Sequence, residues 1–566
     1  MPTQDQPPGS LARLVPAVGW LPRYERKWLR GDVTAGVAVT ALVVPKNLGY
    51  AGIAGVPLQN GLYAAAAGAI IYALFCTSRQ ISTGPSSSLA AVAGGAVLVT
   101  GLGGKAAAEL VAAITLASGL LFLLLAVLRM GWIARFLSKA VVTGFLAGAA
   151  VDVVIGELPK LTGTSSEGDT AWREFSTWLS SLGDVHSTTV LVAVISLAVI
   201  LGLRFLAPAV PGALVLVIGG LLASELFDLG AHGVALVGHV PRGLPAPELP
   251  DLTLVKQHYA TIAIAAAALL LIGFSQTAGD ARAFATRHRY RIDVNQESVA
   301  EGMANIGAGA FQGMPVSTSL SASSLNEAAG ARTPVASLTT GALVLATLIV
   351  LAPLFSHLPK AVLGAVIIDA VVFGMIDVGE LRRLHRVARF DFWVAVAAIL
   401  GVLSAGVLAG VVVGVALSLG WLVYVATRPP MPVLGRERDT QVFRDLDENP
   451  DDETFPGIPV VRLDGGLFFA TAEALEDRIR GLLEVETAPR ALVLDLEGVD
   501  FVDSQGAAKL SDLHALAIAD GITLRLARLK PNVLAVLQAD GIVELVGSGR
   551  IHGNVNRAVE AELAGQ

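Results

Sequence analysis

Apolar segments long enough to cross a membrane recur along most of the chain. They begin at about residue 32 and end at about residue 427, and each has close to the roughly 20 residues that a helix needs to span the hydrocarbon core. We count fourteen of them, joined by short connections. Only 15% of the 566 residues are charged and 54% are hydrophobic, which excludes a purely soluble fold. The pattern predicts an α-helical polytopic membrane protein.

The basic residues of the connecting loops predict the orientation of the segments, because Lys and Arg concentrate in cytoplasmic loops. With the N-terminus inside, fourteen loop Lys and Arg residues fall on the inner side and six on the outer side. An even number of spans brings the C-terminus back to the inner side. No cleavable signal pattern precedes the first span. We therefore expect a cytoplasmic segment at 1–31 and a transmembrane transport domain at 32–427, in the plasma (inner) membrane.

The chain changes character after Thr427. Residues 428–457 combine several prolines with an acidic run, and we expect them to form a solvated linker. Residues 458–566 are expected to form a soluble domain. Strand patterns at 459–463 and 491–496 alternate with helical periodicity at 471–483 and 505–519, which predicts an α/β fold.

Two of the fourteen segments, around 81–88 and 314–321, are interrupted by a proline and a cluster of small hydroxyl residues. They are the third and the tenth, so they hold the same place in two sets of seven. Matched interruptions in two halves point to the binding site of a transporter. A half-helix that begins inside the membrane presents unpaired N–H groups and a positive dipole end, which together favour an anion. The residues expected to bind substrate here are Pro85, Ser86, Ser87, Pro315, Ser317, Ser319 and Ser321.

The alternative for these clusters is that they only kink packed helices. Their matched register favours a site, and Lys46 supports it. Lys46 lies inside the first span directly after Pro45, and a charge at such depth needs a partner or water. We expect it to attract the bound anion; the alternative is a snorkelling or structurally paired lysine.

Acidic residues near the spans are candidates for proton coupling or for pairing with Lys46. We expect most of them to lie near loops or to be structural, with Asp152 the most deeply placed. They are Asp152, Asp280, Glu301, Glu327 and Asp369.

The run that begins at Val44 and ends at Tyr63, and contains Lys46 and Tyr50, resembles the first-helix signature of the sulfate permease (SulP) family of anion transporters. Further motifs resemble the same family, in the same order and over nearly the whole chain. They are Ser78-Arg79-Gln80 with Gly84-Pro85, Asp293 with Asn295-Gln296-Glu297, Asn305 to Pro315, and Gly330-Ala331-Arg332-Thr333.

This resemblance implies two inverted repeats of seven helices, in which a core domain moves against a gate domain and the anion lies between the third and tenth half-helices. It also implies a homodimer and a cytoplasmic STAS domain, and it adds Tyr50 to the substrate-binding candidates. The runs 492–496 and 502–506 resemble the STAS turn that carries a phosphorylatable serine in anti-sigma-factor antagonists. Ser504 matches that serine and is a regulatory candidate; the alternative is a helix N-cap.

The chain departs from the family pattern at three positions. Lys46 stands where the family usually has Gln, and Ala322 stands where an Arg often follows the tenth half-helix's serines. We hypothesise that the anion-attracting charge has been relocated. Gln276 stands where relatives often carry an acid, which puts proton coupling there in doubt. Gln276, Asp280 and Asp152 are the candidate coupling positions.

The sequence thus predicts a secondary active transporter of inorganic or small organic anions, working by alternating access. A sulfate-like oxyanion, bicarbonate or a dicarboxylate is the expected substrate, and symport or exchange with protons or sodium is the expected energy source. The alternatives are an anion channel or an anion-sensing signalling protein with STAS output. With no Walker A pattern, no His/Glu metal cluster and a single cysteine, we expect no enzyme activity, cofactor, metal or nucleic-acid partner.

Overall fold

The computed structural model describes residues 14–129, 138–165, 170–207, 210–238, 243–244, 246–484 and 490–565. The first thirteen residues of the expected N-terminal segment lie outside these ranges. By internal contacts the chain divides into two compact units, Met1–Ser418 and Leu419–Gln566.

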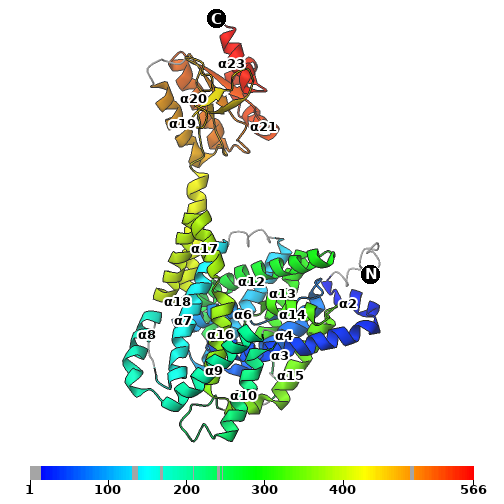
Figure 1. Ribbon diagram of the computed structural model, residues 1–566. Helices are drawn as coiled ribbons and strands as arrows, with labels where there is room; N and C mark the ends of the chain where they lie inside the picture. Colours follow the sequence, from blue (N-terminus) through cyan, green and yellow to red (C-terminus); the bar gives the residue numbers. More distant parts are fainter. Residues whose placement is uncertain are drawn as a thin grey trace. The chain divides into compact units, whose positions relative to one another are not determined.

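The first unit is almost entirely helical (Figure 1). Its long helices before residue 230 are α3 (Leu29–Ile53), α4 (Leu58–Phe75), α5 (Ser87–Thr100), α6 (Gly104–Val127), α7 (Lys139–Thr162), α9 (Ser187–Leu206) and α10 (Gly212–Leu226). Those that follow are α12 (Tyr259–His288), α13 (Val294–Ala310), α14 (Leu320–Ala328), α15 (Val335–Val350), α16 (Lys360–Met375) and α18 (Arg389–Ala426). The end of α18, from Leu419 on, belongs to the second unit. Shorter helices are α2 (Ala17–Trp20), α8 (Ala171–Ser180), α11 (Leu252–Gln257) and α17 (Val378–Val387).

The helical architecture confirms the predicted fold class. Within the described ranges, nine helices are long and apolar enough to cross a membrane, and α5, α10 and α15 are apolar but shorter. The helix α18 consists of two limbs that meet at Gly406, whose φ of 84° is non-helical. The number of fourteen membrane crossings remains a prediction.

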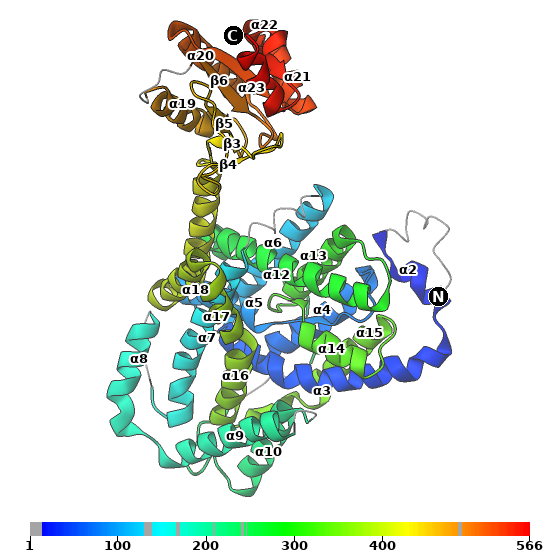
Figure 2. The same cartoon turned by 45° about the horizontal axis from the view of Figure 1, so that its top comes forward.

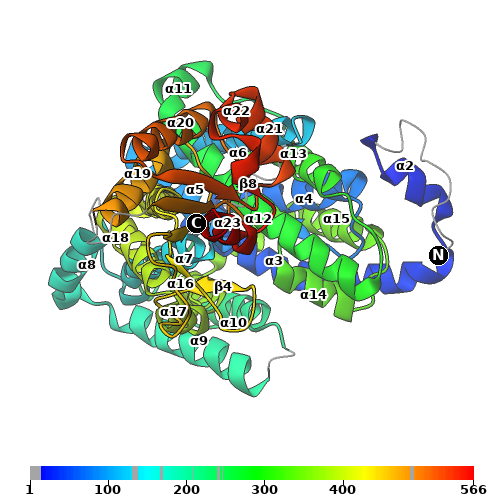
Figure 3. The same cartoon turned by 90° about the horizontal axis from the view of Figure 1, so that it is seen from above.

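The helices of this unit pack as two groups. The first group consists of α3 to α6 and α12 to α15, which contact one another extensively. The second group contains α7, α9, α10 and α16. Figure 2 shows α3 running beside α14 and α15, and in Figure 3 these helices lie to the right while α7, α16 and α18 lie to the left. The groups meet where α3 and α5 contact α16.

Glycine allows the helices of the second group to approach closely. A Cβ added at Gly144 of α7 would lie 2.4 Å from the carbonyl oxygen of Ala395, and one at Gly148 would lie 2.9 Å from Cβ of Val402. The small residues therefore bring the α7 backbone directly against α18, as is usual where lipid supplies no hydrophobic driving force between helices.

The second unit contains a four-stranded parallel sheet in the order β5-β6-β7-β8. The strands are β5 (Val460–Arg462), β6 (Ala491–Asp495), β7 (Thr523–Ala527) and β8 (Ile551–His552). The helices are α19 (Phe469–Leu483), α20 (Ser504–Ala519), α21 (Pro531–Ala539), α22 (Ile542–Val546) and α23 (Val555–Leu563). One apolar cluster joins the sheet to α19–α22 and another joins it to α23, so the predicted α/β domain is confirmed.

The segment expected to be a solvated linker contains a hairpin. β3 (Leu434–Arg436) pairs with β4 (Phe443–Asp445), and the side chains of Leu434 and Phe443 are buried against the sheet. The structure differs from the prediction here because two short apolar stretches flank the charged residues, and hydrophobic burial outweighs the polar composition.

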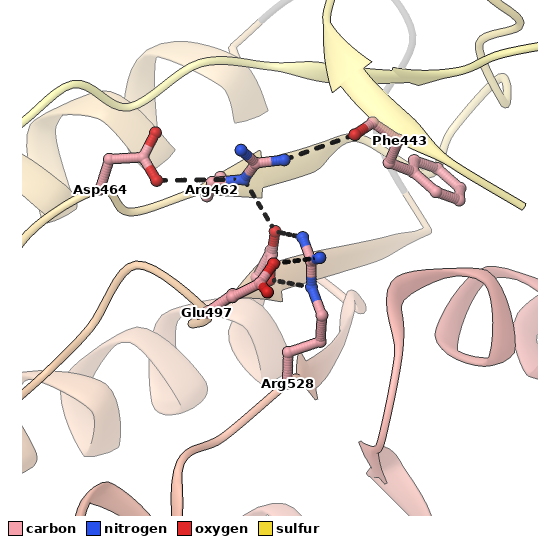
Figure 4. Close-up of polar contacts among 6 residues, drawn as sticks. Phe443, Arg462, Asp464, Glu497 and Arg528 are labelled. Carbon is pink, nitrogen blue, oxygen red and sulfur yellow. Dashed lines mark hydrogen bonds and ion pairs between the residues drawn. The ribbon is translucent and has the colours of Figure 1, made fainter.

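A buried carboxylate anchors this hairpin to the sheet. Asp495 ends β6 with its side chain fully buried, and it accepts from Nε of Arg462 at 3.0 Å and from Nε of Arg528 at 2.9 Å. Arg462 also donates to the carbonyl oxygen of Phe443 at 3.4 Å, as Figure 4 shows. A buried charge is tolerated when it is paired and hydrogen-bonded in this way.

The stability of the second unit should depend on His514. This α20 side chain is 3% exposed, its Nε2 has no partner among the described residues, and burial and nearby Arg550 lower its pKa. Because the unfolded state then binds the proton more readily, stability should fall as pH drops through about 6.5.

Hydrogen exchange of α20 peptides in the full-length protein, corrected for intrinsic rates, should show this loss of protection between pH 7.5 and 5.5. The His514→Leu variant should lose less protection than the wild type over the same range. Equal losses in both proteins would contradict the assignment.

Candidate functional site

The two interrupted segments of the sequence meet in the first unit. β1 (Thr83–Gly84) pairs antiparallel with β2 (Ser317–Thr318), and Ser319 N–H extends the contact by donating to the Ser82 carbonyl oxygen at 3.0 Å. The short ladder satisfies backbone groups that no helix could satisfy, which irregular backbone requires at membrane depth.

Each strand leads directly into a helix. Ser86 caps α5 by accepting from Leu89 N–H at 3.4 Å, and Ser319 caps α14 by accepting from Ala322 N–H, also at 3.4 Å. One side chain satisfies only one of the orphan amides of a first turn. In the described part of the chain, the remaining first-turn N–H groups make no hydrogen bond; they belong to Ser87, Ser88, Leu320 and Ser321.

A cavity of about 420 Å³, including its open mouth, lies at this junction. It brings together five of the predicted binding residues and adds Ser82, Thr83 and Gly84 of the β1 segment, Ala322 and Thr340. The predicted residues that line it are Lys46, Tyr50, Pro85, Ser319 and Ser321.

Four predicted binding residues do not line this cavity. Ser86 contacts Ser88 Oγ at 3.1 Å in the α5 cap, and Pro315 is buried in the approach to β2. Ser317 is fully buried and donates to Gln276 at 2.6 Å. Ser87 lies at the contact with α16, where its Oγ is 3.9 Å from a Cβ added at Gly374.

Lys46 projects from the middle of α3 into the cavity. Its ammonium has neither a hydrogen bond nor an ion pair among the described residues, and its side chain is half-buried. Lys46 thus brings an amine without an ion-pair partner among the described residues into the cavity that Ser321 of the α14 first turn also lines, which is an environment suited to an anion.

The acidic candidates have other partners or lie elsewhere. Asp369 pairs with Arg204, and Glu327 pairs with Arg287 and His288. The buried Glu301 accepts from Thr277 at 3.2 Å. Asp280 accepts from Thr318 at 2.8 Å, next to the cavity, whereas Asp152 lies on α7 and does not line it.

Polar side chains of α12 and α13 hold the strand crossing in place. Gln276 accepts from Ser317 at 2.6 Å and donates to Ser88 at 3.0 Å, so it bridges the two interrupted segments. Asn305 donates to the Val316 carbonyl oxygen at 2.9 Å and accepts from the Val316 N–H at 3.1 Å. In the sequence Asn305 stands out only as part of a motif. The signal of its role is an amide within residues 302–310, the small and apolar second half of α13.

Ser504 lies in the second unit at the first position of α20. Its side chain is exposed, and the N-cap is Asp503, which accepts from Gly506 N–H at 2.7 Å and from Phe469 N–H at 3.1 Å. The alternative that Ser504 is itself the N-cap is therefore wrong.

Comparison with known proteins now decides the family. The sequence profile of the sulfate permease family matches residues 29–398, and that of the STAS domain matches residues 449–558. The chain belongs to the sulfate permease family. Its relatives are transporters, so it is a multi-pass membrane protein of an anion-transporter family with a C-terminal STAS domain.

One curated relative and two solved structures are similar to this chain. A probable sulfate transporter of Mycobacterium tuberculosis is 34% identical over 96% of this chain and 98% of its own. The murine Slc26a9 anion transporter in its inward-facing state shares the fold, with a TM-score of 0.90, 21% identity and coverage of 99% and 96%. The transmembrane domain of the cyanobacterial bicarbonate transporter BicA has a TM-score of 0.58 and 21% identity, covering 70% of this chain and 99% of its own.

Replacing Asn305 with Leu should destabilise the first unit. The change leaves two buried backbone groups of Val316 unpaired, and each such group costs about 1–3 kcal/mol. The midpoint of thermal unfolding in detergent should fall accordingly.

Thr115→Val is a matched control, because Thr115 is fully buried and its hydroxyl donates only within its own helix, to Val111 at 2.7 Å. Its removal leaves the strand crossing intact. Equal effects of the two substitutions would contradict the role assigned to Asn305.

Proposed function

We propose that this protein is a secondary active transporter that binds one small anion in the cavity between α3, the β1 segment and α14 and carries it by alternating access. The observation that supports this most directly is that the Lys46 ammonium, which has no partner among the described residues, lies in a cavity that also contains Ser319 and Ser321 at the start of α14. The family supplies the substrate class, which is a sulfate-like oxyanion, bicarbonate or a dicarboxylate.

The donors of the cavity suit reversible binding of an oxyanion. Hydroxyl groups and first-turn amides can replace part of the hydration shell without adding charge. One ammonium at about 4 Å contributes roughly 4 kcal/mol of attraction at an effective dielectric constant of 20. A single compact charge among neutral donors binds an anion strongly enough to select it and weakly enough to release it.

Two departures from the family pattern occur in this one cavity. Lys46 stands where relatives usually carry Gln, and Ala322, where an Arg is frequent, also lines the cavity. The site keeps one positive charge but receives it from α3 rather than from α14. Lys offers a point charge without the planar, bidentate donors of Arg. The site should therefore be less selective for the shape of the anion.

The two helix groups supply the elements of alternating access. The first group holds both half-helices and Lys46, and it contacts α16 of the second group beside the cavity. We propose that they act as the core and gate domains of a homodimer whose termini are cytoplasmic. Asp280, which accepts a hydrogen bond from Thr318, is the preferred candidate for ion coupling, because Gln276 bridges only uncharged partners. Asp152 as a coupling residue and Ser504 as a regulatory site also stay proposals.

Uptake into proteoliposomes tests this function. Labelled sulfate, bicarbonate and fumarate are offered with and without an inward proton or sodium gradient. A carrier should show saturable uptake of at least one anion and acceleration by the same anion inside the vesicle. Linear, gradient-driven flux without such exchange would instead indicate a channel.

Lys46→Gln should raise KM for the transported anion by about 10- to 100-fold, since each tenfold change corresponds to about 1.4 kcal/mol. Lys105→Gln is the matched control, because the Lys105 side chain is 74% exposed and lies outside the cavity. An unchanged KM and unchanged pH dependence in Lys46→Gln would contradict the hypothesis that Lys46 supplies the anion-attracting charge.

A further inference from the structure

An ion pair between α9 and α16 lies close to the cavity. Arg204 donates from Nε and Nη2 to the two carboxylate oxygens of Asp369, both at 2.7 Å. The guanidinium also lies over the ring of Phe373, 4.4 Å from its centroid. The planar fork of Arg204 therefore engages both oxygens of Asp369 at once, which is the strongest geometry for such a pair.

The helix that carries Asp369 packs directly on the helix that carries Lys46. The Ile367 side chain of α16 lies 3.1 Å from a Cβ added at Gly49 of α3 and 3.3 Å from one added at Gly52. Lys46, one turn before Gly49, interacts electrostatically with both Asp369 and Arg204. A carboxylate and a second cation are thus the charged neighbours of the Lys46 ammonium.

Of the three charged side chains, Arg204 and Asp369 pair with each other and Lys46 has no ion pair among the described residues. Asp369 is the single negative charge of the set, and in this structure Arg204 holds it completely. Lys46 remains without an ion pair among the described residues, although an unpaired charge in a membrane span is costly. If Asp369 were released, Lys46 would be an alternative cation for it, since the two side chains already interact electrostatically.

We propose that Arg204 keeps the Lys46 ammonium available to the transported anion by holding Asp369, the carboxylate that would otherwise neutralise it. Arg204 is then a positioning residue for anion binding, although it does not line the cavity. The inference rests on the anion site proposed above and adds a competitor to it: Asp369 and the anion are alternative partners of one amine.

The three charges are divided between the two helix groups. Lys46 belongs to the first helix group, whereas Arg204 and Asp369 both belong to the second. The pair can therefore stay intact when one group moves against the other. Its charges cancel, so the site carries the single positive charge of Lys46.

Uptake kinetics of four proteins test the competition: wild type, Arg204→Gln, Asp369→Asn and the double variant. With labelled sulfate, bicarbonate and fumarate as probes, Arg204→Gln should raise KM about tenfold or more because the freed Asp369 pairs with Lys46. Adding Asp369→Asn to it should restore KM to within about twofold of wild type. Asp369→Asn alone should not raise KM.

The matched control is Lys160→Gln. Lys160 pairs with the buried Glu157 at 2.6 Å on α7, a comparable ion pair that does not line the cavity. This variant should leave KM unchanged. In a Lys46→Gln background, Arg204→Gln should also have no further effect on KM, a result that a merely structural role of Arg204 would not give.

A second readout does not depend on transport. Labelling of the purified full-length protein with an amine-acylating reagent, followed by mass spectrometry, measures the reactivity of Lys46. It should fall several-fold in Arg204→Gln and return in the double variant. If wild type takes up none of the three anions, the proposed function fails. The reactivity of Lys46 in the variants then still tests whether Arg204 keeps Asp369 away from Lys46.

The inference is overturned by any of three results. The first is a double variant whose KM stays as high as that of Arg204→Gln. The second is a raised KM in Asp369→Asn alone, which remains decisive even if Arg204→Gln does not fold. The third is a Lys46 reactivity that is the same in wild type and in Arg204→Gln.

Discussion

The need to satisfy backbone polar groups away from water governs the transmembrane unit. Two helices, α5 and α14, begin inside the bundle, and their first turns and the strands before them cannot use ordinary helical bonds. The chain meets this need with buried side chains of other helices. Ser323 accepts from Ser82 N–H at 2.9 Å, Asn326 donates to the Gln80 carbonyl oxygen at 2.9 Å, and Asn305 clamps Val316 from both sides.

These side chains leave some first-turn N–H groups of α5 and α14 without a hydrogen bond among the described residues. The side-chain caps of Ser86 and Ser319 each take one amide. The cavity lies at the start of α14, where the Ser321 N–H has no hydrogen-bond partner among the described residues. We propose that a bound anion accepts a hydrogen bond from this amide and that Lys46 supplies the charge that neutral donors lack.

Much of this arrangement is predictable from the sequence, because it depends on local composition. The spans follow from hydropathy, and the two interruptions follow from Pro and Ser at matched places. Lys46 stands out because a charge inside a span is costly. The α/β domain follows from alternating strand and helix patterns, which depend mainly on neighbours in the chain.

The remainder depends on contacts between distant segments. Whether Ser87 faces the cavity or α16 is set by helix rotation, which a cluster of serines does not specify. The sequence indicates Asp369 as a candidate partner for Lys46. The ion pair of Asp369 with Arg204 is not predictable in the same way, because it forms only where α9 packs against α16 in the fold. The β3–β4 hairpin was missed because its burial comes from the sheet rather than from its own polar composition.

The most direct test of the account is an experimental structure of the protein in selenate, with the selenium located by anomalous scattering. We predict one selenium in the cavity, with its oxygens in hydrogen-bonding contact with the Lys46 ammonium and with the first-turn Ser321 amide of α14. No selenium there at a concentration that saturates binding, or one held elsewhere without Lys46, would contradict it.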